Sequence, residues 1–567
     1  MQNIALRPPA LVMDLNRLGA GFASRLSFMR TLMRNMIGND WQIKYSRFDL
    51  DNDGYGHVVF DIQTPSSHLS FVVFSQYLAP DERDDRVIAD QWDLTMTLME
   101  GDVDELTLAK LAANVPLQEA GRIDARCICL SRANRSARIF NEVLDNLRQG
   151  RQPDVQRLAE VGYLYRTTAV YGSGKFGACD WDKVIKQHPD LASPFASEML
   201  VCYLLRQFSI DQLHHLVHQE AYPDAVDMNV DVQRYLGIGN STGLGMAPWL
   251  VNHPQITAQW VLQRETAFAR VLSMPATAPK ISQLQELMAR ACQHVHEVST
   301  FDAWQANNNR MLLADLENLN DWFNNTATEV QDWQQIHAWA ERHYSLEAQE
   351  LLINLMLELY PDIVDSFAQG MAIAESLQYD PTESAQRLAE AIKHTYDWVF
   401  DYNFNDAEQM ATFWYYSQNK VEPRLGKVGV DAGAELQMFL GIAKAVQDCH
   451  ADLHTLLDAD KDATVADFLL QYPSHQGIVA RIATMSKTTY GEIRANLLEE
   501  SVLPMHLLRA KLAFFGVSKF DPKSALWVRN TMFQGAPLVS EINTNGFDDW
   551  SFPVAPDLAY TPEAASG

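Results

Sequence analysis

Cysteine is scarce in this sequence, with six residues in a chain of 567. They are scattered and form no C-x-x-C, so the usual paired-thiol motif is missing and isolated thiols favour a reducing compartment. We therefore expect a cytoplasmic protein. Cys127 and Cys129 form the one close pair, in a segment with strand composition. Residues two apart on a strand share a face, so we expect two small buried side chains on one face.

Long apolar runs are also missing, since none reaches the roughly 18 residues that cross a bilayer. We expect no membrane partner. The first 38 residues hold five Arg and one Asp but no Lys or Glu. That composition is typical of an organelle transit peptide. The apolar residues between Phe22 and Met36 recur at helical spacing and Gly38 is a natural stop, so we expect residues 1–38 to form an amphipathic helix docked on the protein.

Basic residues are outnumbered, with 45 Lys and Arg against 72 Asp and Glu and a net charge of −27. Such a surface repels phosphate backbones, so nucleic acid is excluded as an expected partner. Hydrophobic residues make up 47% of the chain, including 13 Trp, 19 Tyr and 25 Phe. This is ample for a large packed core and excludes a mainly disordered chain.

Hydrophobic periodicity changes along the chain and predicts an α+β fold. Residues 39–185 read as a β-rich module with a glycine turn, because short runs rich in Val, Phe, Ile and Thr alternate with turn residues. We expect an antiparallel meander there. Residues 186–529 carry apolar residues at spacings of three and four, which predicts a large helical domain. Residues 530–567 lose this periodicity and predict an irregular, surface-wrapping tail.

One turn of the β-rich module resembles a calcium loop. Asp49, Asp51, Asp53 and Gly54 occupy the first, third, fifth and sixth positions of the EF-hand pattern. The twelfth position is Phe60, so the bidentate Glu is missing. The flanks also read as strands, so we expect a hairpin turn.

The segment RYLGIGNSTGLGMAPWLVNHP, residues 234–254, fits two catalytic patterns. Its glycine spacing matches some dinucleotide-binding turns, but no clear buried strand precedes it and Pro254 would end the following helix early. GNSTG also matches the G-x-S-x-G elbow of serine hydrolases, with Ser241 as nucleophile. That elbow needs a parallel sheet, whereas the region upstream predicts a meander.

A third interpretation of the same segment is an anion-binding turn. Glycine lets the backbone turn tightly and approach a ligand, and a helix starting near residue 244 would point free N–H groups at it. The alternative is a glycine-rich crossing between packed helices. The substrate-binding candidates here are Gly239, Asn240, Ser241, Thr242 and Gly243.

A second glycine-rich segment, residues 163–182, surrounds a lysine but does not match a P-loop, because Ala169 and Phe176 occupy required positions. Arginine binds carboxylates bidentately, and a lysine or tyrosine in a glycine turn can hold an anion or move a proton. A solvated surface turn is the alternative. The candidates are Arg166, Thr167 and Ser173 for binding, and Tyr171 and Lys175 for catalysis.

Two further segments combine aromatic and charged residues. Residues 413–426 place Glu422 and Arg424 beside an aromatic run, which is typical of small-molecule pockets and equally of a core helix ending in a salt-bridged turn. We take Glu422 as a candidate general base and Arg424 as a substrate-binding charge. Residues 510–537 mix lysines and an arginine with aromatics, and they either cover a pocket or simply pack.

Histidines at i, i+4 occur as His214/His218 and His450/His454. Such pairs can bind a metal, but 16 His on amphipathic helices produce such pairs by chance, so we expect no metal site. The cofactor stays unknown.

The sequence favours an enzyme of unknown reaction class, acting on a small anionic substrate with a carboxylate or phosphate in an interdomain pocket lined by the two glycine-rich loops. A serine hydrolase using Ser241 is one alternative. A non-catalytic helical scaffold that binds protein partners is the other, and it predicts an exposed apolar groove in place of an enclosed polar pocket. Homo-oligomerisation is left open.

Overall fold

The structure is a computed structural model. It describes residues 5–79, 92–114, 125–167, 181–242, 253–298, 300, 302–326, 332–371, 377–406, 414–417, 420–425, 437–439, 442–493, 504–524, 527–544 and 550–558.

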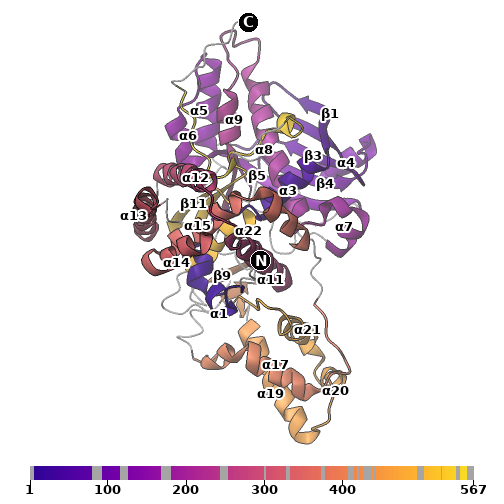
Figure 1. The fold of residues 1–567 in the computed structure, drawn as a ribbon. Helices are drawn as coiled ribbons and strands as arrows, with labels where there is room; N and C mark the ends of the chain where they lie inside the picture. The colour runs from indigo at the N-terminus through magenta and orange to yellow at the C-terminus, as the bar shows by residue number, and fades with distance from the viewer. Residues whose placement is uncertain are drawn as a thin grey trace.

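One sheet of nine strands occupies the upper part of the molecule (Figure 1). Its order is β1-β2-β3-β4-β5-β6-β7-β12-β11, and all neighbours are antiparallel except β6 and β7. The first five strands are consecutive in sequence, which confirms the predicted meander, and the α+β fold class is also confirmed. The strands are β1 (Gln42–Leu50), β2 (Gly56–Gln63), β3 (His68–Ser75), β4 (Leu94–Glu100), β5 (Cys127–Arg135), β6 (Tyr163–Thr167), β7 (Gly237–Thr242), β11 (Lys519–Ser524) and β12 (Trp527–Met532).

The sheet is not confined to the β-rich part of the sequence. Strands β7, β11 and β12 come from the region that reads as mainly helical, and from the start of the expected tail. They are short, six residues each, and β7 contains two glycines, so neither length nor alternation marks them as strands. Their position is decided by pairing with β6 and with one another.

The Asp-rich turn joins β1 to β2 as a hairpin, as predicted. The Asp51 carboxylate accepts hydrogen bonds from the backbone N–H groups of Asp53 and Tyr55 at 2.9 and 2.8 Å. Gly54 and Gly56 have φ angles of 80° and 140°, which side chains rarely allow.

The two cysteines of β5 point to opposite faces, so the expectation of one shared face is wrong. The β4–β5 register shifts between Leu98 and Met99, and these residues pair with Cys129 and Cys127 respectively. Cys129 therefore joins the main core, whereas Cys127 packs in a small separate cluster under α4 (Glu105–Asn114). The irregular register inverts the side-chain alternation that the i, i+2 argument assumes.

Helix α8 (Ala196–Val217) is buried on almost all sides and packs against β4 to β7. A helix that is apolar all round belongs in the interior. Its fully buried Arg206 donates hydrogen bonds to five backbone carbonyls, those of Gln233, Arg234, Leu236, Ala536 and Pro537. Arg206 thereby links residues 233–236, just before β7, to residues 536–537, in the C-terminal segment that follows β12. The smaller helices around this part are α5 (Ala137–Arg148), α6 (Val155–Val161), α7 (Trp181–Gln187), η2 (Pro189–Leu191), α9 (Val230–Tyr235) and η8 (Val539–Glu541).

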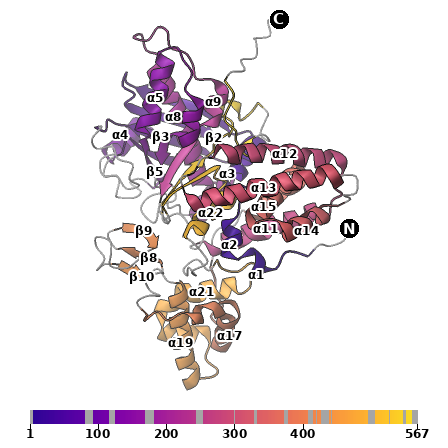
Figure 2. The ribbon, with the colours of Figure 1, turned by 90° about the vertical axis from the view of Figure 1, so that its left-hand side faces the viewer.

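A layer of longer helices lies beside the sheet, with α15 among them (Figure 2). Every residue from Ala348 to Glu358 of α15 is buried. The helices of this layer are α11 (Pro254–Leu272), α12 (Ala278–Glu297), α13 (Ala303–Thr326), α14 (Trp333–His343), α15 (Leu346–Glu358), α16 (Pro361–Val364), η4 (Asp365–Met371) and α22 (Pro504–Phe515).

The N-terminal segment forms three helices, α1 (Pro9–Val12), α2 (Leu15–Gly19) and α3 (Phe28–Gly38), rather than one. Asp14 caps α2 and the chain between α2 and α3 is not helical, which divides the predicted helix. Its five arginines explain the unusual composition, because each forms an ion pair with an acid of the helical layer. The pairs are Arg7 with Glu265 and Glu350, Arg17 with Glu350, Arg25 with Glu358 and Asp365, Arg30 with Glu358, and Arg34 with Asp365.

A second hydrophobic core forms the lower part of Figure 1. Its helices are α17 (Ala385–Thr395), η5 (Asp397–Asp401), α19 (Ile442–Ala459), α20 (Val465–Gln471), η7 (Pro473–His475) and α21 (Gln476–Met485). A separate sheet has the order β10-β8-β9, with β8 (Trp414–Ser417), β9 (Lys420–Leu425) and β10 (Gln437–Phe439). Among the described residues, no helix has both the length and the apolar character needed to span a membrane.

Candidate functional site

Four of the sequence-predicted site residues meet on the two parallel strands of the sheet. Arg166 of β6 pairs with Gly239 of β7, and Thr167 pairs with Asn240. Because β6 and β7 are parallel, their carboxyl ends lie at the same edge of the sheet. In open sheets, ligands bind outside the carboxyl ends of parallel strands.

The described glycines of this region serve strand packing. A Cβ atom on Gly239 would lie 2.5 Å from the ring of Tyr163, and one on Gly237 would lie 2.4 Å from the carbonyl oxygen of Met532. Residues 237–242 form a strand rather than the expected loop, and the absent side chains let neighbouring strands approach. This is a different use of glycine from the ligand contact that the sequence suggested.

Thr167 and Asn240 are completely buried and bond within the sheet. The Asn240 Nδ2 donates to the Thr167 carbonyl at 3.0 Å, and the Thr167 hydroxyl donates to the Arg132 carbonyl at 3.1 Å. The Oδ1 of Asn240 has no hydrogen-bond partner in the described part of the protein, and neither do the amide atoms of Asn530, its cross-strand neighbour. Arg166 is 7% exposed.

The remaining predicted residues are placed only in part. Ser241 lies within β7, paired with Arg529, whereas a nucleophile elbow needs the serine in the turn after a strand. Thr242 is the last residue of β7. Glu422 and Arg424 lie on β9 of the separate three-stranded sheet. Tyr171, Ser173, Lys175 and Gly243 lie outside the described residues, as do the side chains of Ser241, Thr242, Glu422 and Arg424.

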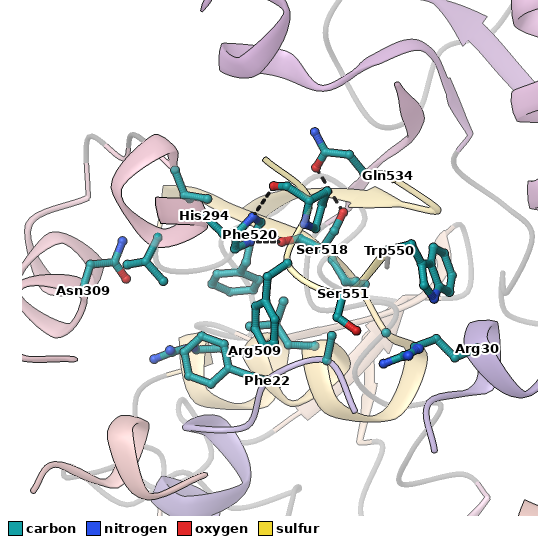
Figure 3. Close-up of a pocket in the computed structure, with 18 of the residues that line it drawn as sticks. Phe22, Arg30, His294, Asn309, Arg509, Ser518, Phe520, Gln534, Trp550 and Ser551 are labelled. Atoms are coloured by element: carbon teal, nitrogen blue, oxygen red, sulfur yellow. Dashed lines mark hydrogen bonds between the residues drawn. The ribbon is translucent and has the colours of Figure 1, made fainter. Parts of the chain in front are cut away.

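A pocket that the sequence analysis did not locate lies elsewhere, between the N-terminal segment, α12, α13, α22, β11 and the C-terminal segment (Figure 3). The space it outlines is about 740 Å³, a volume that includes open solvent. None of the predicted site residues is among its described lining. We call it the arginine pocket, after Arg30 of α3 and Arg509 of α22.

The two arginines are buried, with exposures of 4% and 1%. Arg30 pairs with both oxygens of Glu358, and Arg509 donates to Glu347 Oε1 at 3.1 Å. The Nε atom of each is buried without an acceptor among the described residues. Burial lowers the pKa of Arg509, although Glu347 acts in the opposite direction. Each of these two lining guanidiniums thus keeps one N–H donor without an acceptor among the described residues.

Two further polar atoms of the lining have no described partner, Gln305 Oε1 and Ser551 Oγ. The Gln305 amide is oriented by its Nε2, which donates to Asn309 Oδ1 at 2.7 Å. Figure 3 shows Arg30 and Arg509 entering the view from opposite sides, with Ser551 between them. The pocket therefore offers donors and an acceptor that the folded chain leaves unused.

Aromatic rings complete the walls. The guanidinium carbon of Arg509 lies 5.0 Å from the ring centroid of Phe22, and that of Arg30 lies 6.0 Å from that of Trp550. Phe520 and Phe552 add apolar surface. Apolar walls with a few placed polar groups are typical of small-molecule sites.

His294 holds the C-terminal segment against the pocket. Its Nδ1 lies 2.7 Å from the Pro553 carbonyl oxygen and its Nε2 lies 3.0 Å from that of Ser518. Burial lowers the pKa of His294, while the two carbonyls oppose this shift. With both ring nitrogens engaged, His294 is a positioning residue and not a free base. Arg290 Nε also donates to the Phe552 carbonyl, at 3.3 Å.

Part of the lining of the arginine pocket comes from a segment that the sequence analysis had singled out. Residues 510–537 supply much of the lining, including Leu512, Val517, Ser518, Phe520 and Gln534, which matches the interpretation that this stretch covers a pocket. The N-terminal arginines stood out only as a compositional anomaly. Their meeting with α22 and with residues 550–553 depends on contacts across the length of the chain.

The histidine pairs form no larger metal cluster within the described ranges, where no group of three or more His, Cys, Asp or Glu is placed to hold an ion. Nε2 of His450 and Nε2 of His454 lie 3.0 Å apart, and His218 contacts Asp227. No protein-family model, curated protein or solved structure matches this chain.

Proposed function

We propose that this protein binds a small molecule with an anionic group and a partly apolar body in the arginine pocket. The observation that carries the proposal is the pair of buried guanidiniums, Arg30 and Arg509, each with a buried Nε that lacks an acceptor. A buried donor without a partner costs about 1–3 kcal/mol, and a ligand oxygen at either Nε would remove that cost.

The charge of the lining favours an anion. Arg30 and Arg509 are the only permanently charged residues among the described lining residues. Guanidinium groups bind carboxylate and phosphate oxygens through charge-assisted hydrogen bonds, which are stronger in a water-poor site. Gln305 and Ser551 would fix the orientation of a polar group between them.

The walls favour an apolar or aromatic body on the same molecule. Phe22, Phe520, Trp550 and Phe552 present rings to the cavity. Rings on several sides and buried polar groups between them are the combination that small-molecule sites use. Nucleotides, acyl thioesters and aromatic carboxylates combine the two features, so they form the first test panel.

The test is a thermal-shift screen with carboxylates, phosphates, nucleotides and CoA esters, followed by titration calorimetry of any hit. A ligand at a hundred times its Kd stabilises the native state by about 2.7 kcal/mol. Arg509→Gln removes one anchor, and Val298→Trp fills the pocket without breaking an ion pair. We expect both variants to lose the shift.

The matched control is Arg310→Gln, an exposed arginine on α13, the helix that carries Gln305. It should keep the full ligand shift. A hit that stabilises wild type, Arg310→Gln and Val298→Trp alike binds elsewhere and refutes the proposal. If no anionic compound in the panel stabilises the wild-type protein, the proposal is also refuted.

A second candidate function is catalysis on a small anionic substrate at the edge shared by β6 and β7. The in-register pairing of Arg166 with Gly239 supports it, since it brings the starts of both glycine-rich segments together. Lys175 and Tyr171 stay its predicted catalytic residues, and Glu422, on β9 of the separate three-stranded sheet, stays the predicted general base. An activity screen with Lys175→Met as the comparison tests it, and turnover that is unchanged in this variant removes lysine from the mechanism.

A further inference from the structure

A second group of arginines lies away from the arginine pocket, where the N-terminal segment meets α11 and α15. We call it the Arg–Glu cluster, and its members are Arg7, Arg17, Arg264, Glu265 and Glu350. No side chain in it is more than 9% exposed. The cluster joins residues that are more than 250 positions apart in the sequence.

The two carboxylates of the cluster each accept three hydrogen bonds from arginines. Glu350 Oε1 accepts from Arg7 and Arg17 at 3.1 and 2.9 Å, and its Oε2 accepts from Arg264 at 2.6 Å. Glu265 accepts from Arg7 at both oxygens, at 2.7 and 2.8 Å, and from Arg264 at 3.0 Å. Every carboxylate oxygen of the cluster thus accepts at least one hydrogen bond from an arginine.

The cluster carries one excess positive charge, because three guanidiniums face two carboxylates. Arginine stays protonated in proteins. Burial alone would raise the pKa of Glu350, but Arg7, Arg264 and Arg17 lower it well below its usual range, so it is ionised. Burial lowers the pKa of the neighbouring His337 to about 4, so this ring is neutral at pH 7. Burial also raises the pKa of Tyr490 to about 12.

A small cavity adjoins the cluster, and Arg264, one of its lining residues, has an unused N–H donor. The cavity is lined by Arg7, Arg17, Arg264 and Glu350 together with apolar residues such as Trp260, and the space it outlines, about 330 Å³, includes open solvent. Arg264 is 4% exposed, and its Nε has no acceptor among the described residues. An uncompensated buried charge is costly, so the site lacks one negative charge at a place where there is room for it.

We propose that this cavity binds one small monovalent anion, of the size of a halide or formate, held by Arg264 Nε and the excess charge of the cluster. The anion completes the charge balance of the ion pairs that fasten the N-terminal segment to α11 and α15. Multiply charged anions are disfavoured, because the excess is a single charge and much of the lining is apolar.

The first test is thermal unfolding of the purified protein in sodium chloride, bromide or formate, compared with sodium gluconate at equal ionic strength. Gluconate controls for screening, which acts on all surface charges. Above the Kd, each tenfold rise in free chloride should change the folding equilibrium constant tenfold. Gluconate should give no such rise.

Arg264→Gln should remove the halide-dependent rise in Tm, whereas the exposed-arginine control Arg310→Gln should keep it. Bromide diffraction from wild-type crystals gives an independent readout that needs no variant, with an anomalous peak expected within about 3.5 Å of Arg264 Nε. A halide effect that persists in Arg264→Gln, or the absence of a peak at saturating bromide, overturns the proposal. Neither result depends on what the arginine pocket binds.

Discussion

Replacing Glu350 by Gln tests the energetic role of the Arg–Glu cluster. Glu350 is the carboxylate that all three arginines share, and it is buried on α15. The amide keeps the shape of the side chain but removes its charge, so the cluster changes from one excess positive charge to two. Removing one partner from a buried ion pair typically costs about 3–5 kcal/mol, because the other charges stay buried and uncompensated.

The assay is chemical denaturation at pH 7, which reports the free energy of unfolding. We expect Glu350→Gln to lose about 3–5 kcal/mol, a large share of the roughly 5–15 kcal/mol typical of a folded protein. Glu286→Gln, an exposed substitution of the same chemistry on α12, should stay within about 0.5 kcal/mol of wild type.

The pH dependence adds a second check with a defined sign. The folded pKa of Glu350 lies below its unfolded pKa of about 4.3, so the stability it contributes is present above pH 4.3 and is lost as pH falls towards the folded value. Below pH 4.3, the difference between wild type and Glu350→Gln should shrink by about 1.4 kcal/mol per pH unit. A variant within about 1 kcal/mol of wild type at pH 7, with an unchanged denaturant slope, would refute the reasoning.

Three further predictions concern other parts of the fold. Gly239→Ala should destabilise the protein by about 1–3 kcal/mol in chemical denaturation, because the new Cβ would lie 2.5 Å from the Tyr163 ring. In the control Gly38→Ala the new Cβ would have no neighbouring atom within 4 Å, so the free energy of unfolding should not fall. Thr464→Ala removes a capping box from α20 and should lower the stability of the second core by about 1 kcal/mol; an unchanged melting curve for that core would contradict the role of the cap. Burial holds the pKa of His337 in the folded protein near 4, so the unfolded chain binds more protons at this residue between about pH 4 and 6.5. The free energy of unfolding should therefore fall as the pH falls through this window. His337→Gln should flatten this pH dependence, and an unaltered slope would show that His337 does not cause it.

Strand pairing brings four of the predicted site residues together, and their role in a site stays a prediction. Sequence reasoning singled out Arg166, Thr167, Gly239 and Asn240 by composition, and β6 and β7 place them in register. It could not show that Gly239 faces an aromatic ring across strands, because Tyr163 reaches it only through strand pairing. The arginine pocket had no local motif at all, since Arg30 and Arg509 are 479 positions apart (509 − 30).

The sequence by itself determined the features that depend on neighbours along the chain. Short runs rich in Val, Phe, Ile and Thr between turn residues predicted β1 to β5. Asp and Gly residues predicted the β1–β2 turn, and apolar periodicity predicted the long helices. These features depend on local backbone preference and on which face is apolar, and both can be read within about ten residues.

Only the tertiary structure decided the features that depend on distant partners. It completed the sheet with β7, β11 and β12, turned Cys127 and Cys129 to opposite faces, and matched five N-terminal arginines to acids on other helices. The excess positive charge near Arg264 arises only because the N-terminal segment, α11 and α15 meet in space. Coulomb energy and hydrogen-bond satisfaction depend on distance in space, and residue spacing along the chain does not record it.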